Sequence, residues 1–373
     1  MQPCNTLPHS TVSGRNTLRA LSRPRNTSRS VRRRVDVSQT TRCVMDATAV
    51  QPAAPIVTEV RQLSLENDSL GRERVALSEV GWKKWMWRDH TVNFVQAGEC
   101  GEPIVLIHGF GASAYHWRYN IPELAKQHRV YALDLLGFGF SEKAVTDYTG
   151  AQVWSDQVAD FVREVVGEDT KVVLAGNSLG GFVSLATAAR HPDMVKGLIC
   201  LNSAGYFEDP NSENVEVDTE ELNVLQSWWK STVAAFQESV KRAVIMFSFY
   251  STKSRVKQVL DRVYINTDSV DDELVRSILL PAEDKRAAEV FYRIISGTTS
   301  ESRASVDSLL RELKVPLYLV WGDRDPWITP DKATKIMDLY SNSKKLGLDA
   351  GHCPQDEVPE QVNAAMLEWM ATL

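Results

Sequence analysis

In this 373-residue chain, the residue whose sequence context most clearly indicates a chemical role is Ser178, in the pattern Gly-x-Ser-x-Gly. An apolar run at residues 172–175 precedes the pattern, and an unbroken helical pattern at 182–190 follows it. A serine in such a strand-to-helix turn exposes its hydroxyl above a sheet, and the glycines on either side avoid clashes with the close-packed backbone. We therefore predict a nucleophile elbow at Ser178, with a glycine-rich turn without chemistry as the alternative.

A serine hydroxyl becomes a good nucleophile only when a base takes its proton, so a histidine is expected later in the chain. Of the seven histidines, His352 follows a late strand-like segment at residues 345–349. We predict His352 as the base, with a hydrogen-bonded loop histidine as the alternative. His108 ends another strand beside glycines, which favours a role in fixing that loop over direct chemistry.

The acid that orients the histidine is expected after the apolar run at residues 315–321, where two aspartates follow. Asp325 is the predicted acid because it stands three residues after Gly322, and Asp323 stays open as an alternative or as a loop-capping residue. The chain order serine, aspartate, histidine is the one expected of an α/β-hydrolase, whereas two other well-known triad folds have different orders.

The negative oxygen formed during attack on a carbonyl needs backbone N–H groups that already point at it. One is expected from Leu179, directly after the serine. The second is expected from Phe110, because the apolar run at residues 104–107 leads straight into His-Gly-Phe-Gly. These two residues are the predicted oxyanion hole.

Strand-like and helix-like segments that could position these residues alternate along the chain. The strand-like runs are residues 104–107, 129–134, 172–175, 197–202, 315–321 and 345–349, with helical stretches such as 151–166 and 182–190 between them. This alternation predicts an α/β fold with a parallel sheet covered by helices on both faces. Residues 84–96 predict an antiparallel hairpin at the sheet edge around Arg88-Asp89-His90, in which Trp85 and Trp87 are packing residues.

About a hundred residues between the strands near 204 and 315 do not fit this alternation. Residues 222–250, 253–264, 271–280 and 281–295 are predicted to be helices. Such an insertion lies at the active-site end of the sheet, so we predict a cap or lid. Its large side chains either form the cap's own core or line an apolar pocket; they are Trp228, Trp229, Phe236, Met246, Phe247, Phe249 and Tyr250.

Over about residues 80–373 the chain resembles the α/β-hydrolase superfamily, of the AB hydrolase-1 type. The motifs that carry the resemblance are 108–111 (HGFG), 134–141 (DLLGFGFS), 176–181 (GNSLGG) and 321–327 (WGDRDPW). It implies a mostly parallel eight-stranded sheet with a helical cap inserted after strand 6. Together the motifs look like plastid hydrolases of plants and algae, a group with enzymes similar to pheophytinase and chlorophyll dephytylase, which cleave the phytyl ester of chlorophyll-type pigments. A serine at the elbow excludes haloalkane dehalogenases and epoxide hydrolases, which use aspartate there.

The N-terminal 45 residues hold nine arginines and one acid, Asp36, which is the composition of a transit peptide. We therefore expect a transit peptide at 1–45, a linker at 46–79, the hydrolase core at 80–205 and 313–373, the cap at 206–312, and a chloroplast location. Without those nine arginines and one aspartate the formal net charge of −6 becomes −14. An acidic mature chain argues against a nucleic-acid partner, although a basic arm for nucleic acid is the alternative for the tail.

The remaining sequence signals are mostly negative. Three cysteines lie after residue 45, at widely separated positions: Cys100, Cys200 and Cys353. An odd number of scattered cysteines leads us to expect reduced thiols and no zinc site. We expect no metal, no cofactor and no transmembrane helix, and we consider peripheral contact with the thylakoid membrane because of the cap's aromatic residues.

The predicted function is hydrolysis of a carboxylic ester of a bulky lipophilic substrate through an acyl-enzyme, with a phytyl ester of chlorophyll or pheophytin as the substrate that the resemblance implies. Three alternatives stay open: a lipid or general carboxylesterase, a carbon–carbon bond hydrolase of the meta-cleavage type, and a small-molecule receptor of hydrolase fold that does not turn over.

Overall fold

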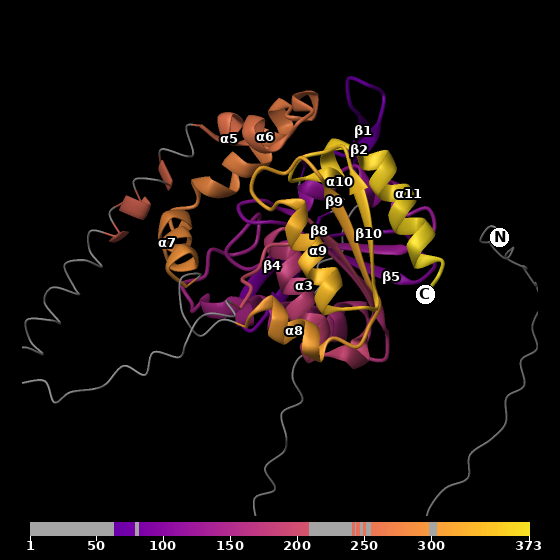
Figure 1. The fold of residues 1–373 in the computed structure, drawn as a ribbon. Coiled ribbons are helices and arrows are strands. Elements are labelled where there is room, and N and C mark those ends of the chain that lie inside the picture. Colours follow the sequence, from indigo (N-terminus) through magenta and orange to yellow (C-terminus); the bar gives the residue numbers. More distant parts are fainter. Residues whose placement is uncertain are drawn as a thin grey trace, which may run out of the picture. The chain divides into compact units, whose positions relative to one another are not determined.

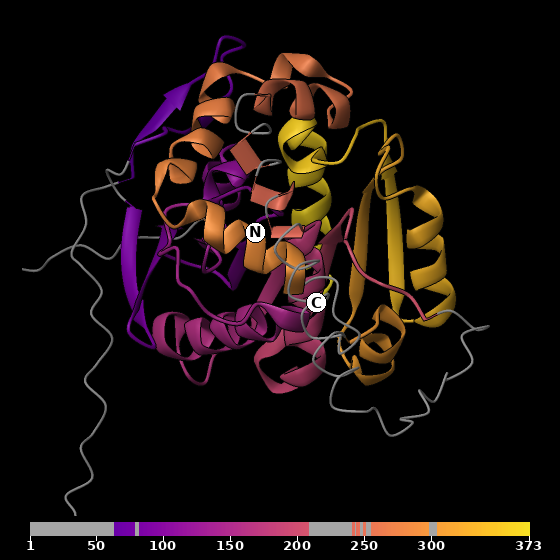
Figure 2. The ribbon, with the colours of Figure 1, turned by 90° about the vertical axis from the view of Figure 1, so that its left-hand side faces the viewer.

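Eight strands form one mixed sheet in the computed structural model of the chain (Figure 1). The structure describes residues 63–78, 82–208, 241–242, 244–246, 249–250, 255–297 and 304–373. The strands are β3 (Trp82–Trp87), β4 (His90–Ala97), β5 (Pro103–Ile107), β6 (Arg129–Leu133), β7 (Val172–Asn177), β8 (Val195–Leu201), β9 (Leu317–Gly322) and β10 (Ser343–Leu348). Their order is β10-β9-β8-β7-β5-β6-β4-β3, so the first and last strands lie at opposite edges (Figure 2).

Strand direction follows the predicted pattern. β4 pairs antiparallel with β3 and with β6, and the other neighbours pair in parallel. Trp87 pairs with His90, so Arg88 and Asp89 alone form the turn, with positive φ angles of 45° and 67°. Two successive positive φ angles give the tight turn whose twist matches two antiparallel strands. The mostly parallel eight-stranded sheet and its edge hairpin are thus confirmed.

The helices of the described residues lie between these strands in the chain, except for α10 and α11, which follow β10. The α-helices are α1 (Asn120–Leu124), α2 (Gln152–Phe161), α3 (Leu179–Arg190), α5 (Val256–Val263), α6 (Asp272–Leu279), α7 (Ala287–Gly297), α8 (Val306–Glu312), α9 (Pro330–Leu339), α10 (Pro354–Glu357) and α11 (Pro359–Met370). Short 3-10 turns are η1 (Ala114–Trp117), η2 (Thr149–Ala151), η4 (Pro192–Met194), η5 (Thr267–Ser269) and η6 (Pro281–Glu283), and η3 (Val162–Val166) is a π-helical extension of α2.

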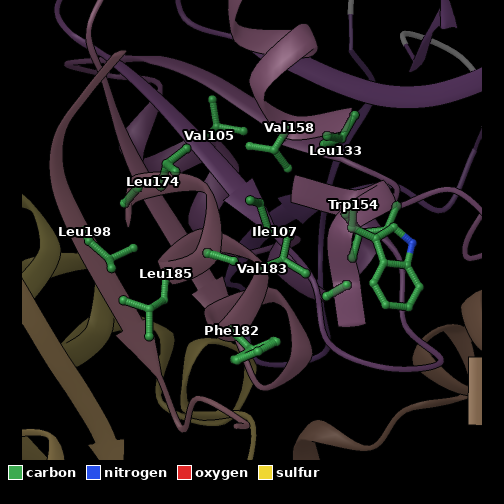
Figure 3. Packing of buried hydrophobic residues seen from close by; sticks show 14 of the residues in the cluster. Val105, Ile107, Leu133, Trp154, Val158, Leu174, Phe182, Val183, Leu185 and Leu198 are labelled. Atoms are coloured by element: carbon green, nitrogen blue, oxygen red, sulfur yellow. The ribbon is translucent and has the colours of Figure 1, made fainter. Parts of the chain in front are cut away.

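The sheet is buried on both faces because successive strand residues point to opposite sides. Val105 and Ile107 pack in one core cluster with side chains of α2 and α3, such as Val158 and Val183 (Figure 3). The same cluster includes side chains of α8 and α9. Ile104 and Leu106 belong to the cluster with α1 and α11. Continuous apolar runs in the sequence therefore correspond to strands covered by helices on both faces, as predicted.

The segment between β8 and β9 contains the predicted cap, after the sixth strand of the sheet. α5 and α6 lie side by side in Figure 1 and form a small apolar cluster, which also includes Cys353 of the core. α8, which the predicted cap range includes, packs against α3 and α9 instead. One predicted helix is wrong in part: residues 281–295 are η6 followed by α7, since Asp284 is extended and its carboxylate accepts a hydrogen bond from the N–H of Arg286. The predicted helix at 222–250 lies mainly outside the described residues.

The expected linker at 46–79 needs a correction over residues 63–78. β1 (Leu65–Asn67) and β2 (Glu73–Val75) pair antiparallel there, and Val75 is fully buried. The N–H of Val75 donates to the carbonyl of Arg118, which attaches this hairpin to the core. Polar residues on a short hairpin resemble a linker by composition, which is why the sequence pattern misses it. The predicted transit peptide at 1–45 lies outside the described residues.

Candidate active site

The turn between β7 and α3 has the geometry expected of a nucleophile elbow. Ser178 adopts φ 54° and ψ −117°, a conformation that non-glycine residues rarely occupy. A Cβ on Gly176 would lie 2.2 Å from the carbonyl oxygen of Gly180, and a Cβ on Gly180 would lie 2.2 Å from that of Ile107. Only glycine fits at these two positions, because a Cβ atom would overlap the neighbouring backbone. Ser178 is the N-cap residue of α3.

His352 and Asp325 form a hydrogen-bonded pair in the loops after β10 and β9. The distance from His352 Nδ1 to Asp325 Oδ2 is 2.6 Å, and both side chains are buried. Burial alone raises the pKa of Asp325, but the hydrogen bond and charge of His352, with the N–H groups of Trp327 and Ile328, lower it below its ordinary value. The acid is thus held in the ionised form, which accepts a hydrogen bond from the Nδ1–H of the imidazole.

The structure separates the two candidate acids. Asp323 is exposed and lies 3.3 Å from the ammonium of Lys345. Asp325 accepts hydrogen bonds from His352 and, at 2.8 Å, from the side-chain amide of Asn202. The geometry therefore places Asp325, and not Asp323, against the histidine.

The two predicted oxyanion donors belong to the elbow itself and to the loop after β5. Leu179 is the first residue of α3, where backbone N–H groups have no acceptor within the helix. A Cβ on Gly109 would lie 3.3 Å from Ser178 Cβ, so the loop that carries Phe110 runs directly past the serine. Both N–H groups thus belong to backbone that adjoins the Ser178 side chain.

His108 holds the Phe110 loop, as the sequence pattern predicts. Its Nδ1–H donates to the carbonyl of Gly109 at 2.7 Å, and its Nε2 accepts from the N–H of Leu135 at 3.0 Å. One donor and one acceptor role define a neutral ring. Complete burial lowers the pKa of His108 and keeps it neutral, so it is a fixed link between the loops after β5 and β6.

Two asparagines at strand ends, which the sequence analysis did not single out, connect the site. The side-chain amide of Asn177 donates to the carbonyl of His352 at 2.9 Å and so joins the elbow to the histidine loop. Asn202 adopts φ 39°, accepts from the N–H of Gly322 and donates to Asp325. The sequence does contain a signal for these two residues, because each asparagine directly ends a buried-strand pattern. The carboxyl ends of parallel strands are where binding and catalytic sites form in such sheets.

Ser178 and His352 line one cavity of about 310 Å³ at the carboxyl ends of the strands. Its walls are mainly apolar and come from three cap helices and the loops of the core. The cap side chains that line it are Phe249, Val256, Val259, Leu260, Val263, Ile278, Leu279, Pro281, Ala282, Ala287, Phe291 and Ile294. In the described residues, α5, α6 and α7 thus line the same cavity as Ser178 and His352.

The aromatic residues predicted for the cap have different positions. Phe249 lines the cavity and packs against Phe291, which in turn contacts Phe110. Met246 is half-buried and Tyr250 is exposed. Trp228, Trp229, Phe236 and Phe247 lie outside the described residues.

Three further polar side chains reach the cavity. Lys143 donates to the carbonyls of Gly139 and Ser141, and burial lowers its pKa to about 8. Cys353 is buried, which raises its pKa and keeps the thiol protonated, so it is a packing residue beside His352. His116 is the third.

The described cysteines are free thiols; they are Cys100, Cys200 and Cys353.

The residues that the structure describes contain no group of three or more side chains arranged to hold a metal ion. Within the same residues, no helix is both long enough and apolar enough to span a bilayer. Ser178 and His352 face one cavity, Asp325 is hydrogen-bonded to His352, and the loop of Phe110 lines the same cavity, an arrangement that can serve acyl transfer.

Comparison with known proteins gives one consistent family. A family model described as alpha/beta hydrolase fold matches residues 102–359. Pheophytinase, chloroplastic, from Arabidopsis thaliana is 32% identical over 80% of this chain and 67% of its own length. A 2-hydroxy-6-oxo-6-(2'-aminophenyl)hexa-2,4-dienoic acid hydrolase from Metapseudomonas resinovorans is 27% identical over 74% of this chain and 87% of its own length.

A solved structure agrees at the level of the fold. A serine hydrolase involved in carbazole degradation superposes with a TM-score of 0.62 and 24% identity, over 78% of this chain and 99% of its own length. At that identity the likeness carries the arrangement of sheet and helices and no statement about substrate.

Proposed function

The chain belongs to the α/β-hydrolase family, and we propose that it is a serine hydrolase that cleaves the carboxylic ester of a lipophilic substrate. The observation that carries this proposal is the 2.6 Å hydrogen bond between His352 and Asp325, on the same cavity as Ser178 at its strained turn. A histidine oriented by a buried carboxylate is the base that a serine nucleophile requires.

The mechanism begins when His352 takes the Ser178 proton and the serine oxygen attacks the ester carbonyl carbon. The carbonyl oxygen becomes negative and accepts hydrogen bonds from the N–H groups of Phe110 and Leu179. His352 then gives its proton to the leaving alcohol as the carbon–oxygen bond breaks. Water attacks the acyl-enzyme with the same histidine as base, which releases the acid and restores Ser178. Asp325 stabilises the imidazolium in both halves.

A lipophilic ester fits the walls of the cavity. Burial of apolar substrate surface contributes roughly 25 cal/mol per Å², so side chains such as Phe249, Leu260 and Phe291 favour long or branched hydrocarbon. At about 310 Å³ the cavity holds the reacting ester and part of one chain, so a pigment-sized substrate extends beyond it. The phytyl ester of chlorophyll or pheophytin is our specific substrate proposal, supported by the relative named pheophytinase.

We also propose a chloroplast location, supported by the arginine-rich N-terminal segment and by the word chloroplastic in the name of that relative. Import of the full chain into isolated chloroplasts, with loss of the N-terminal segment, is the expected result. An unprocessed chain outside the organelle contradicts it.

Product analysis tests the substrate. The full chain and its Ser178→Ala variant are incubated with chlorophyll a, pheophytin a, a galactolipid and a short aryl ester. Phytol released only by the unmodified chain supports the phytyl-ester proposal. Hydrolysis of the galactolipid or aryl ester alone supports a carboxylesterase, and no hydrolysis at all contradicts the ester proposal.

Hydrolysis of a carbon–carbon bond is the second candidate function. It is supported by the relative named 2-hydroxy-6-oxo-6-(2'-aminophenyl)hexa-2,4-dienoic acid hydrolase, which aligns with this chain over 87% of that relative's length. The same serine, histidine and acid serve that reaction. A meta-cleavage product added to the substrate panel decides between them, since its yellow colour disappears on cleavage.

A further inference from the structure

His116 is a buried side chain whose two ring nitrogens have no hydrogen-bond partner in the described part of the protein. It is 5% exposed and lines the cavity that also contains Ser178 and His352. Within the described ranges, the other buried side chains with unpartnered polar atoms, such as Trp117 and Gln355, do not line this cavity. His116 therefore combines unmet hydrogen-bonding capacity with access to the site.

The backbone holds His116 in a fixed place. It lies on η1, directly after the loop that carries Phe110, and its N–H donates to the carbonyl of Ser113 at 3.0 Å. Asp134, which is fully buried, accepts a 2.6 Å hydrogen bond from the N–H of Ala114 at the start of η1. A side chain positioned in this way meets a bound molecule without a rearrangement of its own element.

The ring of His116 is neutral. Burial, together with the nearby guanidinium of Arg118 and the neighbouring imidazoles, lowers the pKa of His116 to about 3. A neutral imidazole offers one N–H donor and one nitrogen acceptor. Leaving both unmet in a buried place costs free energy, which a partner in the cavity recovers.

Three other polar side chains around the cavity have protein partners. Lys143 donates to two backbone carbonyls, Asn177 donates to two more, and His352 pairs with Asp325. Among the described side chains of the cavity, His116 is thus the imidazole left to bind a polar group of the occupant.

We propose that His116 binds a second oxygen atom of the substrate, separate from the scissile ester, so that the preferred substrates are esters with an additional oxo or alkoxy oxygen near the reacting carbonyl. The assignment rests on the proposed function, because it names a substrate feature for the same cavity. His116 is a specificity-determining residue in this scheme, and the apolar wall receives the hydrocarbon part of the same molecule.

Two matched pairs of esters test the proposal. Ethyl 3-oxobutanoate is compared with ethyl butanoate, and 2-methoxyethyl butanoate with butyl butanoate. Within each pair one CH₂ is replaced by C=O or by oxygen, on the acyl side in the first and on the alcohol side in the second. The readout is the ratio of kcat/KM for the oxygenated ester to that for its saturated partner, measured in the full chain.

His116→Phe keeps a ring and removes both nitrogens, and we expect it to lower this ratio about tenfold in at least one pair, the effect of one lost hydrogen bond. His116→Gln keeps a donor and an acceptor and is expected to retain part of the ratio. Gln355→Met is the matched control, since Gln355 is also buried and has no hydrogen-bond partner for its side-chain amide, but does not line the cavity. Its ratio is expected to stay at that of the unmodified chain.

Equal loss for both members of each pair in His116→Phe overturns the proposal, because a purely structural or water-filled role predicts that result. An unchanged ratio in both pairs overturns it as well. Labelling with a fluorophosphonate separates this failure from failure of the proposed function: a labelled Ser178 with no selective effect refutes the His116 assignment alone. An unmodified chain that is neither labelled nor active refutes both.

Discussion

Replacing Asp325 with Asn tests the best-defined contact of the site. Asp325 Oδ2 accepts hydrogen bonds from His352 at 2.6 Å and Asn202 at 2.8 Å, and Oδ1 accepts one from the N–H of Trp327 at 2.8 Å. All three neighbours are donors. An asparagine has one accepting oxygen, so its NH₂ group must face either Trp327 or the pair formed by His352 and Asn202.

When the NH₂ group faces His352, the imidazole accepts at Nδ1 and carries its proton on Nε2, the nitrogen that must receive the Ser178 proton. The same aspartate-to-asparagine exchange in a serine protease lowers kcat about 10⁴-fold. That factor corresponds to about 5.4 kcal/mol of transition-state stabilisation. We expect a loss of about 10³-fold to 10⁴-fold for Asp325→Asn, with little change in KM.

Asp323→Asn is the matched control, because Asp323 is exposed and pairs with Lys345. A surface change of this kind is expected to alter kcat by less than about threefold. Initial rates with a chromogenic aryl ester give kcat, and circular dichroism establishes that both variants are folded. A larger loss in Asp323→Asn, or an Asp325→Asn variant with more than about a tenth of the original kcat, refutes the assignment of the acid.

Three further outcomes are expected. Ser178→Ala lowers kcat on the order of a millionfold if the triad acts as a unit, measured with the same aryl ester; ordinary turnover contradicts the nucleophile. Arg118→Ala lowers the free energy of unfolding by about 3–5 kcal/mol, measured in urea, because it leaves fully buried Asp356 and partly buried Asp271 without their 2.8 Å partner; a loss below about 1 kcal/mol contradicts a structural role. Because folding lowers the pKa of Asp325, its carboxylate stabilises the folded protein at pH values above the ordinary pKa of 3.8. This stabilisation is lost as the pH falls through the lower pKa of the folded state. Asp325→Asn should therefore flatten the acid side of the stability curve, and a parallel curve rejects that reasoning.

Local patterns predicted much of the site, because the elbow and its helix are continuous in the sequence. Gly176 and Gly180 contact each other across four residues, and the β3–β4 hairpin closes over two. Steric requirements of this kind are visible in a short window of sequence. The chain order of Ser178, Asp325 and His352 also favoured the α/β-hydrolase fold over two other folds that carry such triads.

Contacts between distant segments could not be predicted in the same way. Arg118 meets Asp271 and Asp356, which are 153 and 238 residues away, and only tertiary packing brings them together. Asn202 reaches Asp325 across 123 residues. The choice between Asp323 and Asp325, and the direction of His116 toward the cavity, likewise depend on how loops from separate strands meet.

Peptide mass spectrometry of the full chain, acid-quenched during turnover of an aryl ester, tests whether Ser178 is the nucleophile. We expect an acyl group on Ser178 that is absent in Ser178→Ala and in His352→Ala. An acyl group on another residue, or rapid turnover with no acylated serine under conditions where hydrolysis of the acyl-enzyme is slow, contradicts it.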